Sequence, residues 1–183
     1  MTLKKWILIS LPILFFIGFA GANYLGFLSP SFSSVVHKPI QRIDLIDLQG
    51  NRHSFDELKG SDTVIYFFAS WCTPCYKSLM TLEQVTANKQ LPINLLAVAL
   101  DEDIDEINRM LIKTGFTGKV WIASEGTMAL QKRYFGNERR GVPYVVKLDK
   151  DTNIIERSYK LNQLTQWQAV LRDGVSLNKM KSL

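Results

Sequence analysis

Trp71-Cys72-Thr73-Pro74-Cys75 decides the fold prediction, because this stretch holds the only two cysteines of the 183-residue chain. The apolar run 63–68 (TVIYFF) precedes it and predicts a fully buried strand, and the amphipathic stretch 76–89 that follows predicts a helix. A C-x-x-C pair between a strand and a helix start is the arrangement that thiol–disulfide chemistry requires. The stretch therefore predicts a redox-active pair.

The two cysteines are expected to differ in charge and in burial. At the start of a helix, unpaired backbone N–H groups and the positive end of the dipole would stabilise a thiolate at Cys72, lowering its pKa from the free value of about 8.5. Pro74 suits the first turn, since its missing N–H costs little there. Cys75 lies one turn further in and is expected to be more buried. We therefore predict that Cys72 attacks a partner disulfide and that Cys75 resolves the mixed disulfide.

Two other interpretations of the cysteine pair compete with redox chemistry. Half of a zinc site would need further ligands, but the chain has no second cysteine pair, and His37 and His53 both lie upstream without ligand-like spacing. A purely structural disulfide across so short a loop would gain little from closure. Both interpretations are disfavoured.

The N-terminus carries an apolar segment that predicts a membrane anchor. Lys4 and Lys5 precede the stretch 6–28, which has no charged residue and only Ser10 and Asn23 as strongly polar residues. As a helix this stretch would span roughly 34 Å, enough for a bilayer core. Positive charge on the N-terminal flank predicts that this end stays in the cytoplasm and that the rest of the chain is exported.

A cleaved signal peptide is the alternative to a retained anchor. Residues 20–22 (AGA) fit a cleavage site, but the apolar run continues through Leu28, which favours retention. Both interpretations place the folded part outside the cytoplasm. We predict a cytoplasmic stub and transmembrane signal anchor over 1–29, a linker over 30–40 and one folded domain over 41–183.

The charge balance is mildly basic. Lysine and arginine number 22 against 17 acidic residues, or 20 against 17 once Lys4 and Lys5 are set aside. This excess does not indicate a nucleic-acid partner. The densest basic group consists of Lys132, Arg133, Arg139 and Arg140. It is either a solvated loop face or a surface that guides an acidic partner.

Alternating strand and helix patterns fill the rest of the domain. A strand is expected at 43–48, turning at 49–51 into a second short one, and a buried strand at 93–100. The remaining expected elements are a helix that begins after the acidic run 101–103 and ends at Gly115, a strand at 120–122, a helix at 128–135, a hairpin of strands at 143–148 and 154–158, and a helix at 164–172. This order predicts an α/β sheet with one antiparallel edge.

The chain resembles the thioredoxin superfamily, and specifically its TlpA/ResA/DsbE-like branch of membrane-anchored thiol–disulfide oxidoreductases. The resemblance covers nearly the whole exported part, and the segments that carry it are 43–50 (IDLIDLQG), 55–60 (FDELKG), 68–75 (FASWCTPC), 141–143 (GVP) and 149–151 (DKD). It implies a thioredoxin-like three-layer sandwich with a mixed central sheet, preceded by one N-terminal transmembrane helix. It implies no cofactor and no metal.

The resemblance also implies roles for residues beside the cysteines. Pro143 would be a cis proline packed beside a redox-active Cys72–Cys75 disulfide, although a trans proline is the default from sequence alone. Val142 would offer backbone groups to an extended substrate segment. Trp71 would pack beside the active site, and the alternative is an ordinary core aromatic.

Two departures from the family pattern concern the resolving cysteine. Many thioredoxins carry a buried Asp six residues before the first cysteine, where this chain has Tyr66. ResA-like relatives place a Glu three residues after the second cysteine, where this chain has Ser78. Such a carboxylate can relay the proton of the resolving thiol. Glu83 is two turns along the helix and is expected to face solvent, so what deprotonates Cys75 stays open.

The functional prediction is an anchored oxidoreductase acting on protein thiols and disulfides on the outer side of a bacterial inner membrane. The resemblance favours reduction, including that of apocytochrome c, with electrons from a membrane donor of the DsbD/CcdA type. An oxidant or isomerase is the first alternative. A non-catalytic binding or metallochaperone module is the second, disfavoured because no histidine follows His53. A peroxidase is disfavoured because Ala69 stands where peroxiredoxins have a Thr.

Overall fold

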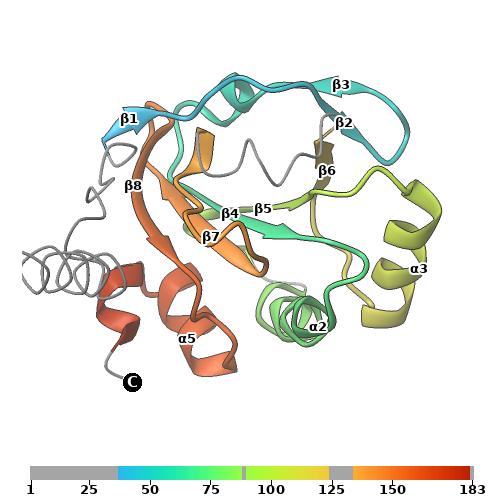
Figure 1. The fold of residues 1–183 in the computed structure, drawn as a ribbon. Helices are drawn as coiled ribbons and strands as arrows, with labels where there is room; N and C mark the ends of the chain where they lie inside the picture. The colour runs from blue at the N-terminus through green and yellow to red at the C-terminus, as the bar shows by residue number, and fades with distance from the viewer. Residues whose placement is uncertain (1–36, 88–89, 124–133, 182–183) are drawn as a thin grey trace, which may run out of the picture. The chain divides into compact units, whose positions relative to one another are not determined.

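A mixed β-sheet forms the centre of the computed structural model, which describes residues 37–87, 90–123 and 134–181 (Figure 1). Within these ranges the sheet has eight strands in the order β1-β8-β7-β4-β5-β6-β2-β3. Their bounds are β1 Lys38–Pro39, β2 Leu45–Asp47, β3 Arg52–His53, β4 Thr63–Phe68, β5 Asn94–Ala99, β6 Val120–Ala123, β7 Tyr144–Leu148 and β8 Asn153–Ser158.

The described helices confirm most of the expected ones. They are η1 Phe55–Leu58, α2 Thr73–Thr86, α3 Ile104–Thr114, α5 Leu164–Leu171 and η2 Leu177–Lys181. Asp103 caps the N-terminus of α3, and Gly115 ends this helix in the left-handed conformation, at φ 69°. The helix expected at 128–135 lies outside the described residues except for Tyr134 and Phe135, which are helical.

β4 is the central strand, and the cysteine pair follows its C-terminal end. It runs parallel to β5 and antiparallel to β7, and each of its six residues is buried. A strand that is paired along both edges and covered on both faces reads as a continuous apolar run. The expected hairpin is also present, since β7 and β8 pair antiparallel across a turn at 149–153.

Alternation along β4 divides the core into two clusters, one on each face of the sheet. Tyr66 and Phe68 point into a cluster shared with α2, α3 and α5. Ile65 and Phe67 point into a second cluster, with residues of η1 and with Phe135. Figure 1 shows α2 and α5 on one side of the sheet. The mixed sheet with helices packed against it confirms the expected thioredoxin-like α/β fold.

The helix after the cysteines begins earlier than its hydrophobic pattern predicts. The pattern predicts a start at Tyr76, whereas α2 begins at Thr73 with Cys72 as its N-cap. Apolar periodicity does not reach the first turn, because Thr73 and Pro74 face solvent there. At the other end α2 stops at Thr86 with Ala87 as its C-cap, and the last two predicted positions, 88 and 89, lie outside the described residues.

The N-terminal expectations are tested only in part. Lys38 and Pro39, assigned to the linker 30–40, pair with β8 and so belong to the sheet. The sequence did not predict this strand, because pairing with a distant strand leaves no local pattern in two residues. No helix within the described residues is long and apolar enough to cross a membrane, and the predicted anchor lies outside them.

The hairpin of β2 and β3 is held to the sheet by a histidine between two carboxylates. The His53 ring lies 3.0 Å from Glu57 and 3.2 Å from Asp47, and it stacks on Trp121 with 4.8 Å between centroids. The hydrogen bond to Glu57, then that to Asp47, raises the pKa of His53 above its usual value. The hydrogen bond to His53, then that from the backbone N–H of Ser54, lowers the pKa of Glu57.

We expect the hairpin contact to make stability depend on pH. Because the folded-state pKa of His53 is raised, its contribution is complete below the unfolded value of about 6.5 and is lost as the pH rises through the folded value. His53→Gln should therefore lower the free energy of unfolding at about pH 6 and have much less effect at about pH 9. Urea denaturation at both pH values measures this difference, and an equal loss at both would contradict the charge argument.

Candidate active site

Cys72 and Cys75 form a disulfide at the junction of β4 and α2. The two sulfurs are 2.03 Å apart and the two Cα atoms 5.2 Å apart. Cys75 is fully buried, whereas Cys72 keeps 4% of its surface exposed. The difference agrees with the expectation that the second cysteine is the more buried one. Cys72 is therefore the less buried of the two cysteines.

The start of α2 holds the sulfur of Cys72 against a backbone donor. As the N-cap, Cys72 accepts a hydrogen bond at its Sγ from the N–H of Cys75, with 3.2 Å between N and S. N–H groups at a helix start have no intrahelical partner, and the dipole there favours negative charge. A thiolate formed at Cys72 on reduction would be stabilised by this donor.

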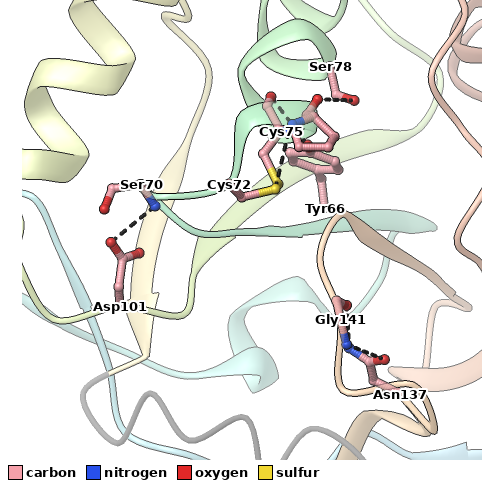
Figure 2. Close-up of a disulfide and its surroundings, with 9 residues drawn as sticks. Tyr66, Ser70, Cys72, Cys75, Ser78, Asp101, Asn137 and Gly141 are labelled. Carbon is pink, nitrogen blue, oxygen red and sulfur yellow. Dashed lines mark hydrogen bonds between the residues drawn. A yellow bond between two sulfur atoms is a disulfide. The ribbon is translucent and has the colours of Figure 1, made fainter.

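A carboxylate from the neighbouring strand fixes the chain just before the cysteines. Asp101 follows β5, and its Oδ2 accepts a hydrogen bond from the backbone N–H of Ser70 at 3.0 Å (Figure 2). Its other oxygen, Oδ1, is buried and has no hydrogen-bond partner. The sequence predicted that the acidic residues 101–103 place negative charge at the start of a helix. Of these residues only Asp103 caps α3. Asp101 instead holds the active-site loop.

Trp71 follows this anchored residue and projects into solvent. Its side chain is 64% exposed, so the alternative that it is a core aromatic is wrong. An exposed indole next to a disulfide offers a flat apolar surface to a partner. Trp71 is thus exposed next to Cys72 in the chain, and its packing beside the active site stays a prediction.

The second loop of the site contains a cis proline. The peptide bond between Val142 and Pro143 is cis, which confirms the conformation that the resemblance implies. Val142 packs against the apolar cluster that includes both cysteines. The chain before it is fixed by Asn137, a buried residue that donates to the carbonyl of Gly141 at 2.8 Å and accepts from its N–H at 3.3 Å (Figure 2).

The basic group predicted near this loop is described only in part. Lys132 and Arg133 lie outside the described residues. Arg139 and Arg140 are exposed, and the guanidinium of Arg139 lies over the ring of Tyr159 at 5.0 Å. Its cation–π contact gives Arg139 a structural role in the loop.

The residues at the three positions that could help to deprotonate Cys75 make different contacts. Tyr66 and Ser78 are buried, and the Tyr66 hydroxyl donates to the carbonyl of Cys75. The carboxylate of Glu83 accepts two hydrogen bonds from Thr117, one from the backbone N–H at 2.8 Å and one from the hydroxyl at 3.0 Å. Glu83 therefore ties α2 to the segment before β6 through exposed hydrogen bonds, so it lies at the surface as expected but is held by Thr117.

Sequence reasoning missed Asp101 and Asn137 as parts of the site. Each contacts backbone near a cysteine or the cis proline, yet Asp101 is 31 positions from Ser70. The position of Asp101 could have been predicted, because it follows a buried strand that runs parallel to β4, and the ends of parallel strands meet at one edge of the sheet. The position of Asn137 could not, because this residue lies in a stretch without periodicity.

A disulfide at a helix start, a cis proline and a thioredoxin-like sheet together define a thiol–disulfide oxidoreductase. Within the described ranges no group of three or more His, Cys, Asp or Glu residues could hold a metal ion. The sequence pattern described as Redoxin matches residues 28–170. The chain therefore belongs to the redoxin family.

Individual relatives agree with this class. Thiol-disulfide oxidoreductase ResA from Bacillus cereus is 22% identical over 135 residues, which cover 73% of this chain and 75% of the relative. A thiol:disulfide interchange protein from Bacteroides sp. has a TM-score of 0.61 at 18% identity, covering 74% of this chain and 87% of that one.

A secreted Mycobacterium tuberculosis disulfide oxidoreductase, described as homologous to E. coli DsbE, has a TM-score of 0.52 at 19% identity, covering 64% of this chain and 82% of that one. At such identities the two solved structures show the fold alone. The names of the sequence relative and of this solved structure are consistent with the resemblance to the ResA/DsbE-like branch.

Removing the Asp101 acceptor should slow the chemistry without changing the fold. Asp101→Ala leaves the N–H of Ser70 without its partner, so the loop carrying Trp71 and Cys72 loses its fixed position. We expect kcat/KM for reduction of a protein disulfide to fall roughly tenfold, since small misplacements of reacting groups are costly. Turbidity from insulin reduction measures the rate.

Asp101→Asn is the matched control for this prediction. The amide keeps an oxygen that can accept from Ser70 and removes only the charge. We expect it to retain most of the wild-type rate. If the Asn variant were as slow as the Ala variant, the carboxylate charge rather than the hydrogen bond would be the feature that matters.

Proposed function

We propose that this chain reduces disulfides in proteins outside the cytoplasm, with Cys72 as the attacking thiolate and Cys75 as the resolving thiol. The observation that carries the proposal is the pairing of a slightly exposed Cys72 at the start of α2 with a buried Cys75. One sulfur can meet a substrate, and the other is screened from it. This asymmetry suits an ordered exchange in two steps.

The proposed exchange moves two electrons from the dithiol to the substrate. The thiolate of Cys72 attacks one sulfur of the substrate disulfide, that S–S bond breaks, and the other substrate sulfur leaves as a thiolate. Cys75 then loses its proton to solvent and attacks the sulfur of Cys72. The second substrate sulfur leaves, and the Cys72–Cys75 disulfide is formed.

The cis proline loop supports an extended protein segment as the substrate. Val142 and Pro143 are half-buried and sit before β7, so their backbone borders the site rather than the core. The exposed ring of Trp71 adds apolar surface at the same cysteines. We propose that a substrate strand lies along residues 142–143 while its sulfur meets Cys72.

The predicted anchor and one neighbour's description support the location, and the family resemblance favours reduction. The uncharged segment 6–28 follows two lysines, which suits a single-pass anchor in a bacterial inner membrane with the domain on the outer side. The relative is named ResA, and a structural neighbour is described as secreted. We propose reduction, with apocytochrome c among the substrates and a DsbD/CcdA-type membrane protein as donor.

Single cysteine variants test the two assigned roles. Cys72→Ser should reduce insulin disulfides no faster than dithiothreitol alone, because no thiolate remains at the exposed position. Cys75→Ser should lose turnover and instead accumulate a mixed disulfide with its substrate, visible on a non-reducing gel. Turnover by the Cys72→Ser variant, or trapping by it in place of the Cys75→Ser variant, would overturn the assignment.

Thiol trapping in intact cells tests location and direction together. A membrane-impermeant maleimide should label the cysteines of the full chain, and most molecules should be in the dithiol form if a membrane donor feeds them. Deleting residues 1–29 should prevent the labelling. A fully oxidised pair would favour the oxidant or isomerase alternative, and labelling only after lysis would contradict the outer location.

A further inference from the structure

Two buried hydroxyl groups lie beside Cys75, on the side away from solvent. Tyr66 comes from β4 and Ser78 from α2, and their exposed fractions are 0% and 1%. Ser78 follows Cys75 by three residues, so both lie on the same face of the helix. Tyr66 and Cys75 belong to the same buried cluster. Figure 2 shows the tyrosine ring and the serine next to the first turn of α2.

Each hydroxyl donates to a carbonyl of the first helical turn. Tyr66 Oη lies 3.4 Å from the carbonyl oxygen of Cys75, and Ser78 Oγ lies 3.3 Å from that of Pro74. Both distances are long for O–H donors, whose usual distance is about 2.7–2.8 Å. Both hydroxyls are therefore weakly engaged.

These carbonyl bonds can be given up at low cost. In an α-helix the carbonyl of residue i accepts from the N–H of residue i+4, so the helix itself supplies a donor to each of these two oxygens. The hydroxyls occupy the second lone pair of each oxygen. Rotating either O–H group toward a stronger acceptor would leave no buried carbonyl without a partner.

The tyrosine is held in place and stays protonated. Its ring stacks on Phe68 at 6.1 Å and meets Trp167 edge-on at 5.7 Å. Burial raises the pKa of Tyr66 far above its ordinary value, and the nearby Ser78 hydroxyl only partly opposes this rise. The hydroxyl is therefore a donor throughout the physiological range and brings no negative charge to the sulfur.

We propose that Tyr66 and Ser78 turn their hydroxyl protons to the sulfur of Cys75 when the disulfide opens, and so stabilise its thiolate for the resolving attack. This inference rests on the proposed role of Cys75. The proton of Cys75 leaves to solvent, and neither hydroxyl gains or loses one. A neutral pair of donors thus takes the place that a buried carboxylate would occupy, without the like-charge penalty that a carboxylate imposes on a nearby thiolate.

The test measures the thiolate of Cys75 directly, in a Cys72→Ser background where it is the only thiol. Thiolate absorbance at 240 nm is followed against pH. Tyr66→Phe keeps the ring, and Ser78→Ala removes one oxygen. Each substitution should lower the thiolate fraction at a given pH roughly tenfold, which corresponds to a rise of about one in the pKa of Cys75. The double variant should lower it further.

Thr81→Ala provides the matched control on the same helix. Thr81 Oγ1 donates to the carbonyl of Lys77 at 2.9 Å, the same four-residue bond that Ser78 makes, but on the exposed side. It should leave the titration of Cys75 unchanged. Urea denaturation of every variant separates loss of fold from loss of the donor.

Two outcomes would overturn the proposal. An unchanged titration in folded Tyr66→Phe and Ser78→Ala variants would make both hydroxyls structural only. A change of equal size in Thr81→Ala would show that general loosening of α2 is responsible. Neither outcome depends on turnover, so the proposal can fail while Cys72 and Cys75 remain essential in the insulin assay.

Discussion

The burial of β4 is the constraint on which the rest of the structure depends. All six of its residues are buried, and both of its edges are paired, with β5 on one side and β7 on the other. A strand in this position cannot shift by one residue, because a shift would exchange its two apolar faces. The end of β4 is therefore fixed in space, and so is the start of α2 that follows it. One turn of this helix separates the accessible sulfur of Cys72 from the buried sulfur of Cys75.

The end of β4 also explains why the site is assembled from separate loops. Chain ends from neighbouring strands meet at one edge of the sheet, where Asp101 after β5 reaches the N–H of Ser70. The loop before β7 brings the cis bond at Val142–Pro143, fixed through Asn137 and Gly141. Backbone groups at this edge have no ladder partners, so side chains satisfy them. Rigid anchoring and chemical access thus occur together.

Most of the secondary structure could be predicted, because local periodicity reports which faces are buried. The strands at 63–68 and 93–100 and the helix that Gly115 ends are examples. Prediction was poorer where local pattern is weak. The first turn of α2 is exposed, and β1 depends on a partner strand far along the chain. The sequence also left open whether the side chain of Trp71 is exposed, since an aromatic residue suits both the core and the surface.

For the site, the sequence by itself determined the reactive atoms and their local setting: two cysteines spaced for one disulfide, after a buried strand and at a helix start. These features depend on neighbours within a few residues, which a linear pattern records. Only the tertiary structure decided which polar groups surround them, namely Asp101 at Ser70, Asn137 at Gly141, and Tyr66 at Cys75. The contacts of Asp101 and Tyr66 join different elements, and such pairings depend on how strands align and how helices lie on the sheet.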